Sequence, residues 1–269
     1  MPGIDHVVLC VRDLDRAAAF YEGLGFTLTP RAQHPFGTGN RLAQLDGCFL
    51  ELLAVTKPED VPEAAAGEFS FGAYNRDFLS RAGEGFSMLA LKTSSWQDDR
   101  QRFREAGFAE YAPFGFGRTA RQPDGTEVKL DFRLTFAADP AMPDAVFFTC
   151  DHRHPPRVFW KPEYQTHANG AVSITDVYMA GADPAAHRGY LEKLFGPAMD
   201  AQGGLTFAMA SAALHVMTPA AADALSPSGC AVGARAARFV GFRVAVKGAL
   251  PAAVAAKDGF GAFVLFNAA

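Results

Sequence analysis

One order of predicted elements recurs along the chain, and this repetition constrains the fold more than any single motif does. Residues 4–11 are an apolar, branched run typical of a half-buried strand. Residues 14–24 follow with apolar side chains at helical spacing, between Asp13 as a candidate N-cap and Gly25 as a candidate left-handed end. Three short strand-like runs come next, at residues 26–29, 41–45 and 48–55. The predicted order is β-α-β-β-β.

Similar runs begin again further along the chain. The second unit has a helix predicted at residues 96–106 and a last strand at 127–136, which follows the turn at 122–126. The fourth unit is shorter, with an Ala-rich helix predicted at 250–256 and a strand at 262–266. The four units start near residues 4, 88, 172 and 239. Such self-similarity predicts an α+β fold of four βαβββ modules, the last of them abbreviated.

Two long connections separate these units. Residues 57–84 form a longer connection than compact domains normally use, which is typical of a functional lid or a linker. Residues 141–170 join the two halves of the chain. The sequence therefore predicts an N-terminal domain at 1–140, a connecting segment at 141–170 and a C-terminal domain at 171–269.

The composition narrows the function classes. A formal net charge of -4 gives no basic surface of the kind that nucleic acid or an acidic membrane requires, so neither is an expected partner. No run of apolar residues is long enough to cross a membrane. The 4 cysteines have no CxxC spacing, which favours reduced thiols and a cytoplasmic protein. The expected partner is a small-molecule ligand, and a homodimer is compatible with the sequence.

Several short motifs carry a resemblance to a known family. They are the pieces Ile4-Asp5-His6-Val7-Val8, Leu24-Gly25-Phe26, Gly37-Thr38-Gly39-Asn40-Arg41-Leu42 and Leu50-Glu51-Leu52. With the four-unit order they resemble the vicinal oxygen chelate superfamily of glyoxalases, extradiol dioxygenases and bleomycin resistance proteins, and within it the glyoxalase-like domain proteins. The match is good over the first 55 residues, rests on the turn Gln122-Pro123-Asp124-Gly125 in the second unit, and is one of element order in the second half. The resemblance implies modules that pair into two curved mixed-sheet barrels.

In that superfamily a divalent metal in the cavity binds two adjacent substrate oxygens. The resemblance assigns His6 and Glu51 to the inner surface as metal ligands, with Glu51 also the candidate catalytic residue. Aligning the second unit places Ser87 and Lys129 at the corresponding positions, and neither is a customary ligand. Aligning the third unit instead places His215 at the Glu51 position, which makes it a third candidate ligand. The metal would be Zn, Ni, Fe, Mn or Mg.

Purely structural roles are the alternative for His6 and Glu51. His6 can be a hydrogen-bonded histidine of the core. Glu51 needs a partner, because an unpaired buried carboxylate is costly, and Arg41 on the preceding strand could form that ion pair.

Other polar residues are candidates for substrate binding. Arg41 and Lys129 are candidates to neutralise an anionic substrate, as are Arg118 and Arg121 on or beside the later strands of the second unit. The alternative is that the charges of the second unit are solvated. His152 and His167 belong to a His-rich stretch within the connection between the halves. This stretch can line a pocket or can simply anchor the connection.

Two functions follow as alternatives. The first is a glyoxalase-like enzyme that binds a small oxygenated, anionic metabolite in the cavity, with a divalent metal and lyase, isomerase or dioxygenase chemistry. The second is a metal-free binding or sequestration protein of the bleomycin-resistance type. The departures at Ser87 and Lys129 favour the second.

Overall fold

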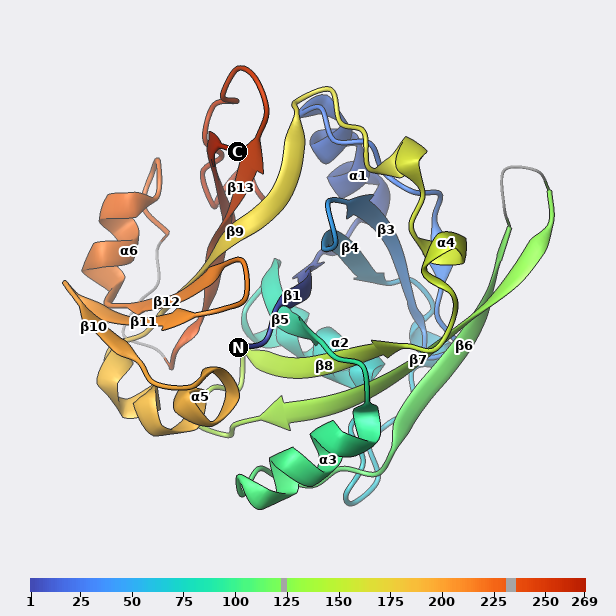
Figure 1. Cartoon of the computed structure of the whole chain (residues 1–269), viewed down its shortest axis with the longest axis horizontal. Helices are drawn as coiled ribbons and strands as arrows, with labels where there is room; N and C mark the ends of the chain where they lie inside the picture. Colours follow the sequence, from blue (N-terminus) through green and yellow to red (C-terminus); the bar gives the residue numbers. More distant parts are fainter. Residues whose placement is uncertain (122–124, 231–235) are drawn as a thin grey trace.

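The computed structural model describes residues 1–121, 125–230 and 236–269, without the side chain of Arg121. Two mixed sheets carry the chain (Figure 1). The first has the strand order β2-β3-β4-β1-β5-β8-β7-β6. Its strands are β1 (Ile4–Cys10), β2 (Ala32–Gln33), β3 (Thr38–Gln44), β4 (Phe49–Val55), β5 (Gly85–Lys92), β6 (Phe114–Arg121), β7 (Glu127–Ala138) and β8 (Val146–His152).

The second sheet has the order β10-β11-β12-β9-β13-β14. Its strands are β9 (Ala171–Ala180), β10 (Met199–Ala201), β11 (Gly204–Ala208), β12 (Ala213–Met217), β13 (Arg238–Val246) and β14 (Phe263–Ala268). The helices are α1 (Leu14–Gly23), α2 (Phe71–Arg81), α3 (Trp96–Glu105), α4 (Pro156–Phe159), α5 (Arg188–Phe195) and α6 (Pro219–Leu225). Short 3-10 turns lie at Pro58–Asp60, Pro162–Tyr164 and Pro184–His187.

Each sheet is built around one antiparallel pair of strands. In the first sheet β1 pairs with β5, and each of these strands pairs in parallel with the strand that closes its own unit, β4 or β8. In the second sheet β9 and β13 form the same central pair, with β12 and β14 as their parallel neighbours. The predicted α+β fold with two mixed sheets is confirmed. The first sheet curls until it is nearly closed, whereas the second is an open, curved sheet (Figure 1).

The start of the first unit shows why the local sequence specifies these elements. Asp13 caps α1, because its side chain accepts hydrogen bonds from the backbone N–H groups of Asp15 and Arg16. Gly25 follows the helix with φ of 89°, a conformation that L side chains rarely adopt. A Cβ at this position would also lie 2.9 Å from the backbone nitrogen of Asn169. Gly25 therefore permits both the turn and the close approach of the connection between the halves.

Four predicted elements differ from the structure. Residues 26–29 form no strand, and the strand that follows α1 is the short β2. The strand predicted to close the second unit at 127–136 is the third strand of that unit, and the closing strand is β8, inside the predicted connection 141–170. The connection 57–84 contains α2, whose buried Phe71, Asn75 and Phe78 recur at helical spacing after the N-cap Ser70. Residues 250–256 are not helical, since a short Ala-rich run that contains a proline gains too little to nucleate a helix.

One apolar core joins the two sheets. Alternate residues of the first sheet, among them Val7 and Leu89, belong to the same cluster as residues of α1, α5 and the second sheet. At its centre the rings of Phe86 and Phe239 stack with centroids 4.3 Å apart, and Phe147 packs edge-on against Phe239. The intervening residues of the first sheet face the opposite way, into a second, aromatic cluster. The first sheet therefore turns its convex face to the core and its concave face to a cavity.

None of the helices in the described ranges has both the length and the apolar character needed to cross a membrane.

Candidate active site

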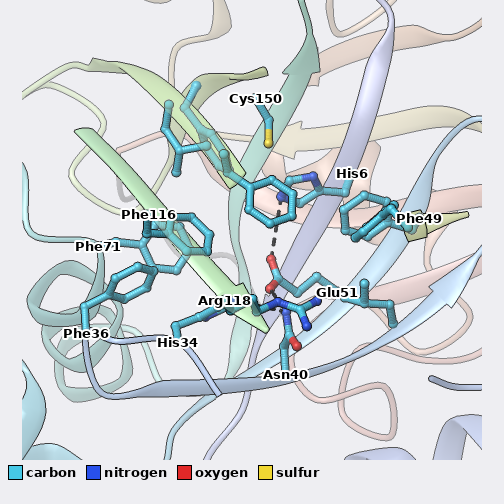
Figure 2. Close-up of a pocket in the computed structure, with 15 residues that line it drawn as sticks. His6, His34, Phe36, Asn40, Phe49, Glu51, Phe71, Phe116, Arg118 and Cys150 are labelled. Carbon is cyan, nitrogen blue, oxygen red and sulfur yellow. Dashed lines mark hydrogen bonds and ion pairs between the residues drawn. The ribbon is translucent and has the colours of Figure 1, made fainter. Parts of the chain in front are cut away.

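The concave face of the first sheet encloses a small cavity of about 40 Å³ (Figure 2). Seven phenylalanines line it: Phe36, Phe49, Phe71, Phe116, Phe132, Phe148 and Phe159. Its polar groups are the side chains of His6, His34, Asn40, Glu51, Arg118 and Cys150. A few polar groups that converge in an otherwise aromatic pocket are typical of a small-molecule site.

His6 reaches the cavity beside a bulge in β1. Ile4 pairs with Leu91 and His6 pairs with Ala90, so Asp5 is an extra residue on its strand. The bulge lets two neighbouring side chains meet, and Asp5 Oδ2 lies 2.6 Å from His6 Nδ1. Asp5 therefore fixes the orientation of the imidazole and leaves Nε2 directed at the cavity.

Asp5 is itself held by a second histidine. His152 Nε2, from β8, lies 3.3 Å from the same Asp5 oxygen. Burial by itself raises the pKa of the Asp5 carboxyl, but His152 and His6 outweigh it and hold that pKa below its usual value. Asp5 is therefore an anion at neutral pH although only 4% of it is exposed.

Glu51 faces His6 across the cavity. Its Oε2 lies 3.6 Å from His6 Nε2, too far for a good hydrogen bond, and its Oε1 accepts a hydrogen bond of 2.6 Å from Asn40 Nδ2 (Figure 2). Burial raises the pKa of the Glu51 carboxyl, while His6, Asn40 and Arg118 counteract part of that rise. The carboxyl is thus shifted toward the range in which it can both accept and donate a proton.

Asn40 is positioned by a short chain of hydrogen bonds. Its Nδ2 also lies 3.3 Å from His34 Nε2, and His34 Nδ1 lies 2.8 Å from Thr38 Oγ1. Burial, with Arg118 and His6 adding to it, lowers the pKa of His34 to about 3, so this imidazole is neutral and its Nε2 accepts from Asn40. Both N–H groups of Asn40 are then used. Its Oδ1 is buried without a hydrogen-bond partner, and a ligand could supply that partner.

Arg118 brings a positive charge to the same cavity. It comes from β6, the strand farthest from β1 on the β5 side of the sheet, and curvature carries it to Glu51 and Asn40 (Figure 2). Burial lowers the pKa of the Arg118 guanidinium, and Glu51 opposes that change. No salt bridge of Arg118 is present within the described ranges, although it lies near Glu51. The guanidinium is therefore available to a bound anion.

Cys150 completes the set of candidate metal ligands. One ligand atom each of Asp5, His6 and Cys150 lie within 4.8 Å of one another. Burial, with Asp5, Glu51 and Asp151 adding to it, raises the pKa of the Cys150 thiol well above its usual value. The group is therefore a thiol unless a cation stabilises its thiolate.

Two predicted substrate-binding residues point away from the cavity. Arg41 alternates with Asn40 on β3, and its Nη2 pairs with Glu22 Oε1 at 2.7 Å on the helix side of the sheet. Lys129 is exposed, because on β7 the neighbouring Leu130 faces inward. The expectation that Lys129 occupies the position of Glu51 is wrong, since β8 rather than β7 is the parallel neighbour of β5.

The other predicted residues lie elsewhere. The ring of His167 is buried in the connection, where Nδ1 accepts from Thr27 N–H at 3.0 Å and Nε2 donates to Gln44 O at 2.7 Å. This pairing anchors the connection. Arg121 ends β6, and its side chain lies outside the described part of the structure.

His215 belongs to the second sheet and does not join His6 and Glu51. Its Nε2 lies 2.8 Å from Asp176 Oδ1 and its Nδ1 lies 3.1 Å from Thr206 Oγ1, both on strands of that sheet. The expected convergence of the three ligands is therefore wrong. The two sheets pack through their convex sides, so their corresponding faces look in opposite directions.

Four residues of the site were not predicted from the sequence as site residues: Asp5, which holds His6, and His34, Asn40 and Cys150, which line the cavity. Asn40 lies one residue before the strand predicted at 41–45, and the structure extends that strand to Thr38, so Asn40 shares a face with Leu42. No sequence pattern predicted the bulge in β1 that brings the Asp5 side chain to His6.

Comparisons with known proteins agree with this architecture. Residues 4–195 match the model of the family described as "Glyoxalase-like domain". No curated protein sequence matches the chain significantly. The structure of a hypothetical protein from Staphylococcus aureus has a TM-score of 0.76 at 14% identity, and the match covers 100% of both chains.

Two further solved structures match this chain in part. A fusion of a xylose isomerase-like TIM barrel with a 4-hydroxyphenylpyruvate dioxygenase has a TM-score of 0.53 at 12% identity, covering 91% of this chain and 36% of that one. A methylmalonyl-CoA epimerase from Mycobacterium tuberculosis has a TM-score of 0.40 at 19% identity, covering 58% of this chain and 91% of its own. The family match spans most of the chain. This protein therefore belongs to the glyoxalase-like domain family of the vicinal oxygen chelate superfamily.

Proposed function

We propose that this protein is an isomerase-type enzyme that binds a small oxygenated anion in the inner cavity and moves a proton on the carbon beside its carbonyl group. The observation that carries the proposal is that a buried carboxylate and a partly buried cation line the same cavity. Glu51 is a carboxylate with a raised pKa, and Arg118 is a cation that faces the same cavity. A base and an anion-binding group side by side in an apolar pocket are what proton abstraction next to a carbonyl requires.

Each polar residue of the cavity would have its own role in this reaction. Arg118 binds the carboxylate or carbonyl oxygen of the substrate, and the aromatic walls exclude water. Glu51 takes the proton from the carbon, the electron pair of the C–H bond moves onto the carbonyl oxygen, and the resulting enolate is neutralised by Arg118. The enolate is planar at this carbon, and return of the proton from Glu51 to its other face inverts the configuration, which is the isomerisation. His6, held by Asp5, and the orphaned Asn40 oxygen position the oxygenated end.

The donor set also fits a divalent metal. His6 Nε2 is free of other partners, Asp5 orients it in the way that carboxylates orient metal-binding histidines, and one oxygen of Glu51 lies 3.6 Å away. His6, Glu51 and Cys150 would hold the ion. Imidazole and thiolate donors favour Zn, Ni or Fe over Mg or Mn. A bound ion would act as a Lewis acid on the substrate carbonyl.

Proton exchange tests the proposed chemistry without knowledge of the natural substrate. A panel of short 2-oxo acids is incubated with the protein in D2O, and NMR follows deuterium incorporation at the carbon beside the carbonyl. We expect exchange above the buffer rate for at least one acid. The absence of exchange with every acid that binds would contradict the proposal.

Arg118→Gln should weaken anion binding. Because a hydrogen bond to a charged group contributes about 1.5–3 kcal/mol, the dissociation constant of a bound 2-oxo acid should rise roughly 10- to 150-fold. Isothermal titration calorimetry measures this. Arg41→Gln and Lys129→Gln are matched controls, because both side chains point away from the cavity. Equal effects of all three substitutions would exclude Arg118 as the anion-binding group.

Metal content can be measured directly. Protein purified without chelators should carry close to one equivalent of Zn, Ni or Fe by mass spectrometry, and His6→Ala should lose most of it. Cys150→Ser should reduce the affinity, whereas Cys10→Ser should not, because Cys10 lies four residues beyond His6 on β1 and packs against Phe78 and Leu79 of α2. Equal metal content in wild type and His6→Ala would rule out this ion site.

One observation favours metal-free binding as a second candidate function. Among the described lining residues of the second unit, only Arg118 and Cys150 are polar, and the others are apolar: Phe116, Phe132, Leu134, Phe148 and Phe159. A protein that sequesters its ligand needs no more than this. Tight binding with neither metal nor proton exchange would identify that function.

A further inference from the structure

The inner cavity opens into a much larger cleft. The cleft has a volume of about 620 Å³, against about 40 Å³ for the cavity, and the two share Leu42, Arg118 and Phe159 as lining residues. Its walls come from the segment before β2, from β3, from β6 and β7, and from the region of α4. Arg118 therefore stands where cavity and cleft meet.

The sizes of the two spaces limit what can bind. A single water needs about 10–15 Å³ of the same kind of volume, so the inner cavity has room for only a few non-hydrogen atoms. It can take the reacting end of a molecule and little more. Whatever else the substrate carries must lie in the cleft.

The cleft carries positive charge without compensation in its own walls. Arg31, Arg118 and Lys161 line it, and no aspartate or glutamate is among its described lining residues. Within the described ranges, the salt bridge of Arg31 is to Asp15, 3.9 Å away with a side chain 79% exposed, and such a pair contributes little to stability. A cleft with charges of one sign attracts the opposite charge.

Lys161 is held at this wall by the backbone around it. Gln44, at the end of β3, donates from Nε2 to Phe159 O at 2.8 Å and accepts with Oε1 from Lys161 N–H at 3.0 Å. Among the residues that the structure describes, the hydrogen bond of Lys161 Nζ is to a backbone carbonyl, Arg157 O, at 2.9 Å. Its charge is thus positioned but not neutralised.

The rest of the lining is mainly apolar. Side chains that can contact a short hydrocarbon chain include Leu42, Leu130, Val158 and Phe159. Leu42 and Phe159 also line the inner cavity, so the apolar wall begins where the cavity and the cleft meet.

We propose that the cleft is a binding site for the tail of an elongated substrate that ends in a second anionic group, held by Arg31 and Lys161. The substrate class is then an oxo acid with an anion at each end, rather than a small monoanion. This inference rests on the proposed function, since Arg118 and Glu51 receive the reacting end.

Matched pairs of probes test the inference. At each chain length from five to eight carbons, calorimetry compares a 2-oxo monocarboxylate with the corresponding 2-oxo dicarboxylate. In the wild-type protein the dicarboxylate should bind roughly 5- to 20-fold more tightly at one or more lengths, as expected for two partly exposed charge contacts. Arg31→Gln with Lys161→Gln should remove this preference and leave monocarboxylate binding within about twofold.

A control variant loses two positive charges at positions outside the cleft. Lys257→Gln with Arg188→Gln removes two exposed cations that pair with Asp258 and Asp200 far from the cleft, and it should keep the preference. If monocarboxylates and dicarboxylates bind equally, or if both double variants lose the preference equally, the cleft site is wrong while the proposed function stands. If no 2-oxo acid binds at all, the proposed function fails and this inference fails with it.

Discussion

Glu51→Gln should lower the rate of proton exchange by about 10²- to 10⁴-fold, which is the usual contribution of a general base. The amide keeps the shape of the side chain and can still contact Asn40, but it cannot accept the proton. The rate is measured by NMR in D2O with the best acid of the panel. Glu59→Gln, in an exposed carboxylate of the turn after β4, should leave the rate unchanged. Undiminished exchange in Glu51→Gln would exclude this carboxylate as the base.

The same substitution should stabilise the protein without ligand. Burial raises the pKa of Glu51 above its unfolded value of 4.5, so the stability it contributes is fully present below pH 4.5 and is lost as pH rises through the folded pKa. Glutamine carries no such cost. The melting temperature of Glu51→Gln should therefore exceed that of wild type increasingly from pH 4.5 to neutral pH, by about 2–4 °C for each kcal/mol relieved. A difference that stays constant over this range would mean that the ionised carboxylate is not strained by burial.

Phe239→Ala should produce the largest loss of stability. Phe239 is 0% exposed and packs between Phe86 and Phe147, where the two sheets meet. Truncating a phenylalanine in such a core costs about 3–5 kcal/mol, part of it from the cavity left behind. Chemical denaturation measures the change, and Met199→Ala, at a site 55% exposed, should change stability by less than about 0.5 kcal/mol.

The shape of that transition is informative as well. Because one apolar cluster includes residues of both sheets, we expect wild type to unfold in a single transition. Phe239→Ala weakens the contact between the sheets more than it weakens either sheet. Two separate transitions in the wild-type protein would contradict a shared core.

Features that depend on neighbouring residues could be predicted from the sequence. Asp13 as an N-cap and Gly25 at a left-handed turn depend on neighbours within a few residues, and both agree with the structure. The strand-helix-strand order agrees in the first three units and not in the fourth, where residues 250–256 are not helical. The helix α2 was not predicted, although buried residues recur in it at helical spacing, because residues 57–84 were interpreted as one long connection.

Which side chains belong to the site depended on how the strands pair. A side chain on a strand faces the cavity or the solvent according to a period of two, so a shift by one residue exchanges the faces. Arg41, Lys129 and Arg118 are all cations on strands, and only the pairing of the strands selects Arg118. The sequence by itself does not show which alternate residues of a strand face the cavity, because contacts between distant segments decide this.

The sequence by itself therefore determined the α+β architecture and the family to which the chain belongs, because both rest on short patterns repeated along it. Only the tertiary structure decided that Asp5 holds His6, that Arg118 faces Glu51, and that His215 belongs to the opposite face of the molecule. These outcomes depend on a bulge, on the curvature of an eight-stranded sheet, and on two sheets packing through their convex faces. Each of them is a relation between segments far apart in the chain, which no local pattern encodes.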